Sequence, residues 1–262
     1  MNDTNRAKAL AAFDRLLDIM DRLRAECPWD KKQTWESLRT LTIEECYELA
    51  DAILEGDAKG IREELGDLIL HIVFYAKIGD EKKEFTLEDV LNQINEKLIF
   101  RHPHIFGDVK VADSKEVEEN WEKLKLQEGV KKRVLGGIPG SLPAMIKAYR
   151  IQDKARGIGF DWTDREMVWG KVDEEIGELR EEITKDPGSQ EAEDEFGDVL
   201  FSLINVARLY GINPENALER TNAKFIKRFN YLEDKTLLKG RSLRDMTLEE
   251  MDVYWEEAKK AD

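Results

Sequence analysis

Hydrophobic positions recur every three or four residues along most of the chain, with polar positions between them. This period is typical of amphipathic α-helices, and no segment shows the strict alternation of a half-buried strand. The N-terminal half is expected to form helices over roughly Thr4–Glu26, Thr34–Glu55, Lys59–Ile78, Thr86–Phe100 and Ser114–Glu128. The pattern therefore predicts an all-α protein.

Local signals support these boundaries. Thr86 precedes Glu88 and Asp89, which gives a capping hydroxyl followed by acids in the first helical turn. Gly56 and Asp57 are turn residues between the second and third helices. Helices joined by so short a turn are expected to be antiparallel neighbours.

An acidic signature occurs twice, about 130 residues apart. Glu44-Glu45-Cys46-Tyr47-Glu48 precedes Glu64-Leu65-Gly66-Asp67 in the first half, and Glu174-Glu175-Ile176-Gly177-Glu178 precedes Glu195-Phe196-Gly197-Asp198 in the second. The segments Asn95–Arg101 and Trp121–Lys125 recur in the same order as Asn222–Arg228 and Trp255–Lys259. This order indicates two homologous domains made by tandem duplication, and not a short-period solenoid.

The two domains are predicted to span residues 1–128 and 144–262, joined by a linker over 129–143. Glycine and proline are concentrated between Gln127 and Pro143, and few helices tolerate such a density of breakers. A chain of 262 residues is long enough for two ordinary domains.

In each half the acids fall on one face of two adjacent helices, because residues three or four apart share a helix face. The acids concerned are Glu45, Glu48, Glu64 and Asp67 in the first half, and Glu175, Glu178, Glu195 and Asp198 in the second. The same stripes carry apolar residues, so the acids of an antiparallel pair are expected to meet as a cluster of four. Clustered anions removed from water require a compensating cation.

Two interpretations of these clusters are open. Glutamate pairs on helices are usually solvated surface, and the chain has 56 acidic residues. Two pairs per domain on apolar stripes, repeated in both domains, favour a metal site instead. The acidic motifs contain no histidine, which disfavours a di-iron site and favours Mg²⁺, with Mn²⁺ as a substitute. The glycine of each Glu-x-Gly-Asp either permits a close helix approach or is incidental.

The net charge of −15 argues against nucleic-acid polymers and anionic membranes as partners, since both bind basic surfaces. A small anion can still bind where a metal ion and a few basic residues reverse the local field. Cys27 and Cys46 form no CxxC pair, the N-terminus has no apolar signal-peptide core, and no apolar run approaches the length of a membrane span. A reduced, cytoplasmic setting is therefore expected.

Basic and aromatic residues recur beside the acids. The pairs Lys97/Arg101 and Lys224/Arg228 are each spaced i, i+4, and either pair can bind phosphate or form ordinary surface ion pairs. Lys171 precedes Glu175 by one helical turn. Candidates for base stacking, or for core packing, are Trp29, Trp121, Trp162 and Trp255. His102 and His104 are spaced like a metal motif, but the intervening proline and their absence from the second half disfavour a ligand role.

With these residues, the sequence resembles the MazG family of nucleoside triphosphate pyrophosphohydrolases in its full-length, two-domain form. The resemblance covers nearly the whole chain. Besides the acidic motifs it rests on the segments Cys27–Thr34, Arg101–Phe106, Ser141–Ala144 and Gly159–Trp162. The acidic motif alone would indicate the broader all-α pyrophosphohydrolase group, which includes dUTP and dCTP pyrophosphatases.

The resemblance implies Mg²⁺-dependent hydrolysis of ribo- and deoxynucleoside triphosphates to NMP and pyrophosphate. It also implies a homodimer of four-helix-bundle-type domains. Carried over by motif, the metal ligands are the eight acids given above. The substrate-binding residues are Lys171, Lys224, Arg228 and Trp255 in the second domain, and Lys97, Arg101 and Trp121 in the first.

Glu174 and Glu44, each adjacent to a ligand position, are the candidates for the catalytic base. The first domain departs from the pattern at Leu41, which occupies the place of Lys171. Two alternatives stay open: a non-catalytic nucleotide- or metal-sensing dimeric regulator, and a narrower pyrophosphatase of the dUTP or dCTP type.

Overall fold

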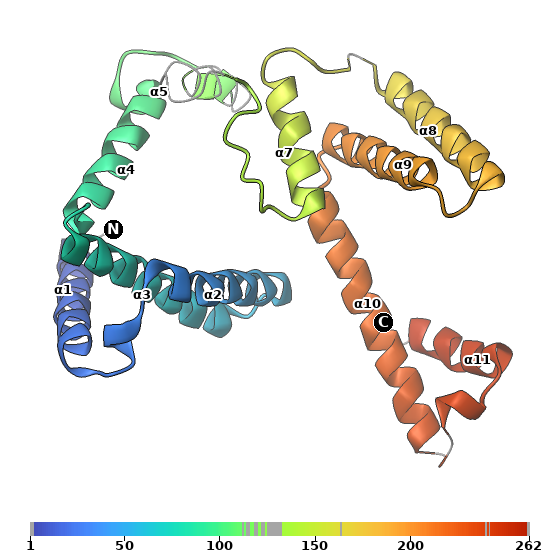
Figure 1. The fold of residues 1–262 in the computed structure, drawn as a ribbon, viewed down its shortest axis with the longest axis horizontal. Helices are drawn as coiled ribbons and strands as arrows, with labels where there is room; N and C mark the ends of the chain where they lie inside the picture. Colours follow the sequence, from blue (N-terminus) through green and yellow to red (C-terminus); the bar gives the residue numbers. More distant parts are fainter. Residues whose placement is uncertain are drawn as a thin grey trace. The chain divides into compact units, whose positions relative to one another are not determined.

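The computed structural model describes residues 3–111, 133–162, 164–238 and 242–260, together with residue 240 and isolated positions between 113 and 124. Within these residues the secondary structure is helical and no strand occurs, which confirms the predicted all-α class (Figure 1). None of the helices in these ranges has an apolar stretch of the length that a bilayer crossing requires. The chain divides into two compact units, Met1–Lys110 and Val111–Asp262, which are described separately.

The first unit contains four long helices, followed by a short one. They are α1 (Asp3–Glu26), α2 (Trp35–Glu55), α3 (Ala58–Lys82), α4 (Leu87–Arg101) and α5 (Pro103–Phe106), with a 3-10 turn, η1, at Asp30–Lys32. The four long helices confirm the first four predicted ranges to within a few residues. The fifth predicted helix, 114–128, lies largely outside the described residues, and the predicted 129–143 linker is described only from residue 133.

The core of this unit lies among α1, α2 and α3. Met20 of α1 and Leu38 of α2 pack with Val73, Phe74 and Ile78 of α3, and all five are almost fully buried. Burial of such side chains is the main stabilising contribution to a small domain.

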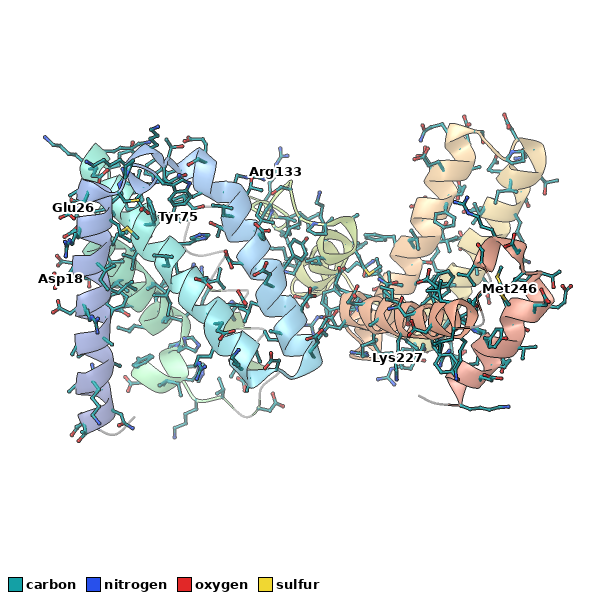
Figure 2. All side chains as sticks on the ribbon, turned by 90° about the horizontal axis from the view of Figure 1, so that it is seen from below. Asp18, Glu26, Tyr75, Arg133, Lys227 and Met246 are labelled. Atoms are coloured by element: carbon teal, nitrogen blue, oxygen red, sulfur yellow. The ribbon has the colours of Figure 1, made fainter. Side chains whose placement is uncertain are left out.

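Polar contacts also tie α2 to α3 and set the register between them. The hydroxyl of Tyr75, which is labelled in Figure 2, lies 2.6 Å from Thr42 Oγ1. Trp35 Nε1 donates a hydrogen bond of 3.2 Å to the carbonyl oxygen of Tyr75. These contacts hold the two acid-bearing helices against each other.

The helix ends follow from capping residues. Gly56 ends α2 in the left-handed region (φ 71°), and the side chain of Asp57 caps α3 by accepting from the Lys59 backbone N–H at 2.9 Å. At the start of α4 the hydroxyl of Thr86 accepts from the Asp89 N–H, and the carboxylate of Asp89 accepts from the Thr86 N–H. This capping box confirms the predicted start.

One boundary differs from the prediction, since α3 runs to Lys82 and not to Ile78. The helix continues through Gly79, where a side chain would lie only 2.7 Å from the ring of Phe85. Gly79 therefore makes room for an aromatic ring and does not end the helix.

The second unit contains five described helices. They are α7 (Ala144–Arg156), α8 (Arg165–Lys185), α9 (Gln190–Leu209), α10 (Pro214–Leu237) and α11 (Leu248–Lys259), with a 3-10 turn, η2, at Leu243–Asp245. Helices α8 and α9 form the main pair, α7 contacts α9 and α10, and α11 packs on α10 (Figure 1). Val168, Val172 and Val206 form the buried centre of the α8–α9 pair.

The connection between α10 and α11 is closed by Met246, labelled in Figure 2, whose sulfur lies 3.6 Å from Thr236 Oγ1. Both residues are buried. This contact holds α11, which carries Trp255, against α10, which carries Lys224 and Arg228.

Candidate active site

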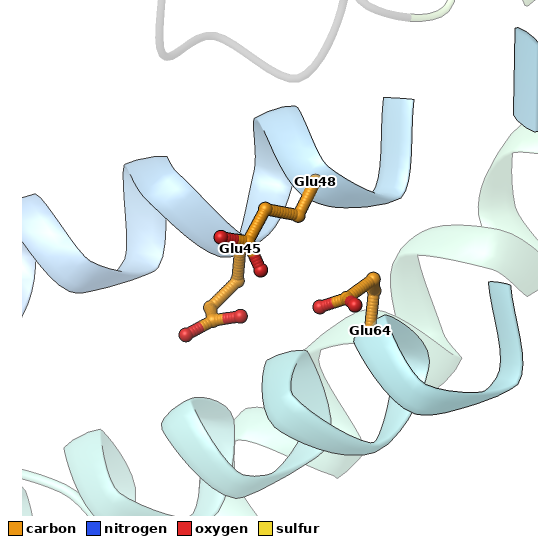
Figure 3. Close-up of side chains that lie close together, drawn as sticks. All are labelled: Glu45, Glu48 and Glu64. Atoms are coloured by element: carbon orange, nitrogen blue, oxygen red, sulfur yellow. The ribbon is translucent and has the colours of Figure 1, made fainter. Parts of the chain in front are cut away.

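In the first unit, α2 and α3 bring three of the four predicted acids together. Figure 3 shows Glu45 and Glu48 extending from α2 toward Glu64 on α3. One carboxylate oxygen from each of the three lies within 4.8 Å of the others. The fourth acid, Asp67, is one helical turn beyond Glu64, and its charge acts on Glu45 and Glu64.

The surroundings of the first cluster disfavour the ionised forms of its acids. Partial desolvation, followed by the charges of Asp67 and Glu48, raises the pKa of Glu45. Partial desolvation and the neighbouring acids likewise raise the pKa of Glu64. Raised carboxylate pKa values mean that the ionised forms repel one another and are incompletely solvated, which is the condition a bound cation relieves.

The second unit repeats the arrangement on α8 and α9. Glu175, Glu195 and Asp198 each place one oxygen within 4.8 Å of the others. Glu178 lies beside them, since desolvation and then the charges of Glu175 and Glu195 raise its pKa. Desolvation and the charge of Asp198 also raise the pKa of Glu195. Glu175 is the most buried acid of the cluster, with 7% of its surface exposed.

Lys171 distinguishes the second cluster from the first. Its Nζ lies 2.8 Å from Glu174 Oε1 and 2.8 Å from Glu175 Oε1. These two hydrogen bonds raise the pKa of Lys171, so the ammonium group stays charged. In the first unit the matching position holds Leu41, which cannot supply a charge.

The donor set of both clusters fits a hard divalent cation. Every member of the two clusters is a carboxylate, and oxygen ligands of this kind suit Mg²⁺ or Mn²⁺. The mutual repulsion described above indicates a site that gains from added positive charge. The motif glycines are not needed for this geometry, because a Cβ at Gly66 or Gly197 would meet nothing within 4 Å. Of the two interpretations of these glycines, the structure therefore favours the incidental one.

The candidate bases lie beside the clusters. Glu174 is exposed and pairs with Lys171, and Glu44 is exposed on α2, one residue before Glu45. Lys97 is exposed and Arg101 half-buried on α4. No contact of Glu174 or Glu44 in the structure tests whether either residue acts as the catalytic base, so both roles stay predictions.

The remaining predicted contacts of the second unit form a separate group on α10 and α11. The ring of Trp255 packs on Phe225, with centroids 4.9 Å apart, and the guanidinium carbon of Arg228 lies 6.0 Å from the Trp255 centroid. Lys224 is exposed on the same helix. Arg228 and Trp255 are therefore neighbours, as a shared binding role would require.

Other candidates stay untested. Trp121 is half-buried, but most residues around it in 112–132 lie outside the described ranges. Trp29 is exposed, and His102 Nδ1 lies 2.6 Å from the carbonyl oxygen of Leu98 at the end of α4. The rings of His102 and His104 lie 5.6 Å apart.

A pocket of about 620 Å³ adjoins the second cluster, and Lys171, Glu175 and Asp198 are among the residues that line it. Sequence reasoning missed three polar residues of its wall, namely Gln152, Asn205 and Arg208. Arg208 forms a two-pronged ion pair with Asp161, one hydrogen bond of which is 3.1 Å long. The signal that the sequence offered for this wall was Asp161, which lies in the Gly159–Trp162 segment that carries part of the family resemblance.

Comparison with known proteins shows the family to which the chain is similar. Residues 33–106 and 166–232 both match the MazG nucleotide pyrophosphohydrolase domain model. The chain is 46% identical to a nucleoside triphosphate pyrophosphohydrolase/pyrophosphatase MazG of Thermotoga maritima, over 95% of this chain and 96% of that protein. It is 41% identical to a nucleoside triphosphate pyrophosphohydrolase of Escherichia coli K12, over 95% and 97% of the two chains.

A third relative is the uncharacterized protein YabN of Bacillus subtilis, which is 46% identical over 95% of this chain but only 52% of its own length. Each of the two domain matches contains one complete set of four predicted acids. With both halves matched and full-length relatives above 40% identity, the chain belongs to the MazG family of nucleotide pyrophosphohydrolases.

Proposed function

We propose that this chain hydrolyses ribo- and deoxynucleoside triphosphates between the α- and β-phosphates, in a Mg²⁺-dependent reaction that yields NMP and pyrophosphate. The observation that carries the proposal is the carboxylate cluster of the second unit, with Lys171 beside it and a pocket sharing its side chains. The names of the full-length relatives support the substrate class.

In this proposal the acids bind the cation and the lysine binds phosphate. Glu175, Glu195 and Asp198, with Glu178 beside them, would hold the cation, which when bound supplies polarisation of the α-phosphate and activation of water. The ammonium group of Lys171 would bind phosphate oxygens that carry negative charge. Lys224 and Arg228 would neutralise the outer phosphates.

The reaction itself is a hydrolysis. A water oxygen bonds to the α-phosphorus, and the bond from that phosphorus to the bridging oxygen breaks, so pyrophosphate leaves with the electron pair. The water proton passes to a carboxylate. Glu174 is the candidate in the second unit, because it is exposed beside the cluster and adjacent to Glu175 in sequence.

The proposal also includes a homodimer. Large apolar side chains of α9 and α10 are exposed in the single chain, among them Phe196, Leu200 and Phe225. Exposed apolar surface of this kind commonly marks an interface. Light scattering should give about twice the chain mass of 30.4 kDa. Leu200→Glu should shift the protein toward monomer, whereas Gln190→Glu, at the exposed start of the same helix, should not.

Product analysis tests the reaction. Purified protein is incubated with ATP, GTP, CTP, UTP, dUTP and dCTP, with Mg²⁺ or with chelator, and NMP, NDP, pyrophosphate and phosphate are resolved. NMP and pyrophosphate in equal amounts, lost with chelator, are expected for most substrates. Turnover confined to dUTP or dCTP would favour the narrower pyrophosphatase. Nucleotide binding without turnover would favour the sensor.

A further inference from the structure

Arg208 joins α9 to the loop that connects α7 with α8. This loop, over 157–162, forms part of the wall of the pocket beside the second cluster through Phe160 and Trp162. Arg208 lies on α9, the helix that carries two acids of that cluster. Its guanidinium donates to both carboxylate oxygens of Asp161, from Nη1 at 3.1 Å and also from Nη2. The pair therefore connects an acid-bearing helix with the pocket wall next to it.

The ion pair contributes more than apolar burial to holding this part of the loop. Phe160 and Trp162 keep 80% and 40% of their surfaces exposed, so apolar burial stabilises their positions only in part. The side chains of Arg208 and Asp161, by contrast, are only 6% and 22% exposed. A two-pronged pair that is shielded from water is stronger and more directional than an exposed ion pair. We therefore expect the position of the loop to depend on this pair.

Further hydrogen bonds fix the orientation of both partners. The guanidinium of Arg208 donates to Asn205 Oδ1, in the same helix, from Nε at 3.2 Å and from Nη2 at 2.8 Å. Asp161 Oδ1 also accepts from the backbone N–H of Trp162 at 2.9 Å. Since Arg208 is held within α9 and Asp161 is held to the next residue of the loop, the helix determines where Asp161 and Trp162 lie.

The first unit has a different contact at the matching position. Arg208 lies ten residues after the cluster acid Asp198. In the first unit the residue ten after the matching acid, Asp67, is Lys77. Its Nζ lies 2.6 Å from Oδ1 of Asp21 on α1, so this lysine pairs with a helix and not with a loop. An ammonium group also cannot form the two-pronged pair of a guanidinium. The link between loop and acid-bearing helix through this position is therefore a feature of the second unit.

We propose that Arg208 is a positioning residue of the second site, which acts through Asp161 to hold the 157–162 loop in the orientation that substrate binding requires. The inference rests on the proposed function, in which a nucleoside triphosphate on the acid cluster reaches the adjoining pocket. With the pair intact, the loop is ordered before the substrate binds. Without it, only a fraction of the molecules have the binding-competent loop, and the apparent affinity falls by that fraction.

The expected kinetic effect is on KM. No residue of the 157–162 loop has a role in the proposed bond cleavage, so an ordered loop favours the bound ground state and the transition state equally. A change that removes such uniform binding raises KM and leaves kcat nearly unchanged. This distinguishes the pair from a residue that holds the metal ion or activates water.

A double-mutant cycle tests this role. Arg208→Lys keeps a positive charge but loses the two-pronged pair, and Asp161→Asn removes the negative charge but keeps an oxygen that can accept from the next N–H. Each single change should raise KM for ATP by about 10- to 100-fold through the lost charged hydrogen bonds. The variant with both changes should have a KM close to that of the single variants, because the two residues act as one unit.

Two further measurements separate positioning from general damage. Amide hydrogen exchange should become faster in the 157–162 loop of Arg208→Lys, while α8 and α9 exchange at wild-type rates. The inhibition constant of inorganic tripolyphosphate, which has no nucleoside, should be the same in wild type and in all three variants. Arg22→Lys, at an arginine that pairs with Glu26 on the exposed face of α1, is the matched control and should behave as wild type throughout.

Three results would each overturn the inference while leaving the proposed hydrolysis intact. They are effects on KM that multiply in the double variant, wild-type exchange rates in the loop of Arg208→Lys, and a tripolyphosphate inhibition constant that rises as much as KM. If wild type binds ATP without turnover, the proposed function fails, and the same cycle is measured as Kd by calorimetry with the same criteria. If wild type neither hydrolyses nor binds ATP, the inference fails together with the proposed function.

Discussion

Lys171 and Leu41 occupy matching positions, one helical turn before Glu175 and Glu45 respectively, and they affect the neighbouring acids differently. The charge of Lys171 lowers the pKa values of Glu178 and Glu195 against the larger raising effect of desolvation. Leu41 gives Glu45 no such compensation, and every charge acting on that residue is negative. The difference at this position therefore favours the ionised acids in the second cluster and gives no such support in the first.

Glu175→Gln should reduce Mg²⁺-dependent NMP release by at least about 100-fold, because even residues that only support a metal ligand typically cost 10- to 100-fold. The same variant should show a smaller rise in melting temperature on Mg²⁺ addition. Glu181→Gln, an exposed acid on the same helix, is the control and should behave as wild type. Near-normal turnover in Glu175→Gln would remove this residue from the site.

Lys171→Leu should move the acid limb of the kcat/KM profile to higher pH. Glu178 and Glu195 bind a cation only when ionised, and loss of the lysine charge raises their pKa values further. KM should also rise about tenfold or more through the lost charged hydrogen bond to phosphate. Lys185→Leu removes a lysine that pairs with Glu182 at the end of α8 and is the control. An acid limb at the wild-type pH would contradict this role.

At the scale of elements, each site consists of two helices that are held together by apolar packing and whose acids repel one another. Val168 and Val172 of α8 pack with Val206 of α9, one or two turns from the acid cluster. The packing stabilises the pair, while the raised pKa values of Glu178 and Glu195 show that the ionised acids oppose it. A divalent cation bound to these acids, as proposed, should therefore also stabilise this helix pair.

The stability of the metal-free protein should depend on the ionisation of these acids. A carboxyl group whose folded pKa is raised above its ordinary value of 4.5 contributes full stability below that value and loses it as pH rises through the folded pKa. In chelator, wild type should therefore gain melting temperature, relative to Glu178→Gln/Glu195→Gln, as pH falls from neutral toward about 5. Calorimetry of both proteins measures the difference.

Taking the difference removes groups that titrate equally in both proteins, such as His71, whose pKa burial lowers. With saturating Mg²⁺ the sign should reverse, because protons then compete with the cation for the wild-type acids. A difference that is flat with pH in chelator would contradict the electrostatic account of the cluster.

The sequence predicted the features that depend on local signals. Helix ends at Thr86 and Gly56 follow from one or two residues, and the meeting of Glu45 with Glu64 follows from helical spacing and one short turn. Gln152 could not be found in this way. Its buried position depends on a contact with Phe201, 49 residues away. No local signal within α7 distinguishes it from a surface glutamine.

At the scale of the whole molecule, duplication has given two acid clusters with different surroundings. The first has the acids but has Leu41 and a core phenylalanine, Phe74, where the second has Lys171 and Asn205. The second also shares its acids with a pocket that has charged and amide side chains in its wall. These differences make the second unit better suited to bind a charged, hydrogen-bonding substrate.

Most turnover should therefore depend on the second cluster. Glu175→Gln/Glu178→Gln should reduce NMP and pyrophosphate release by about 100-fold, whereas Glu45→Gln/Glu48→Gln, the matching change in the first unit, should retain the larger part of wild-type activity. Both pairs supply carboxylates, but only Glu175 and Glu178 lie beside a lysine, Lys171, that can neutralise phosphate. Equal losses in the two variants would mean that both clusters catalyse, or that each unit requires the other. Loss only on changing Glu45 and Glu48 would mean that the first unit is the working site and that the charge of Lys171 serves α8 alone.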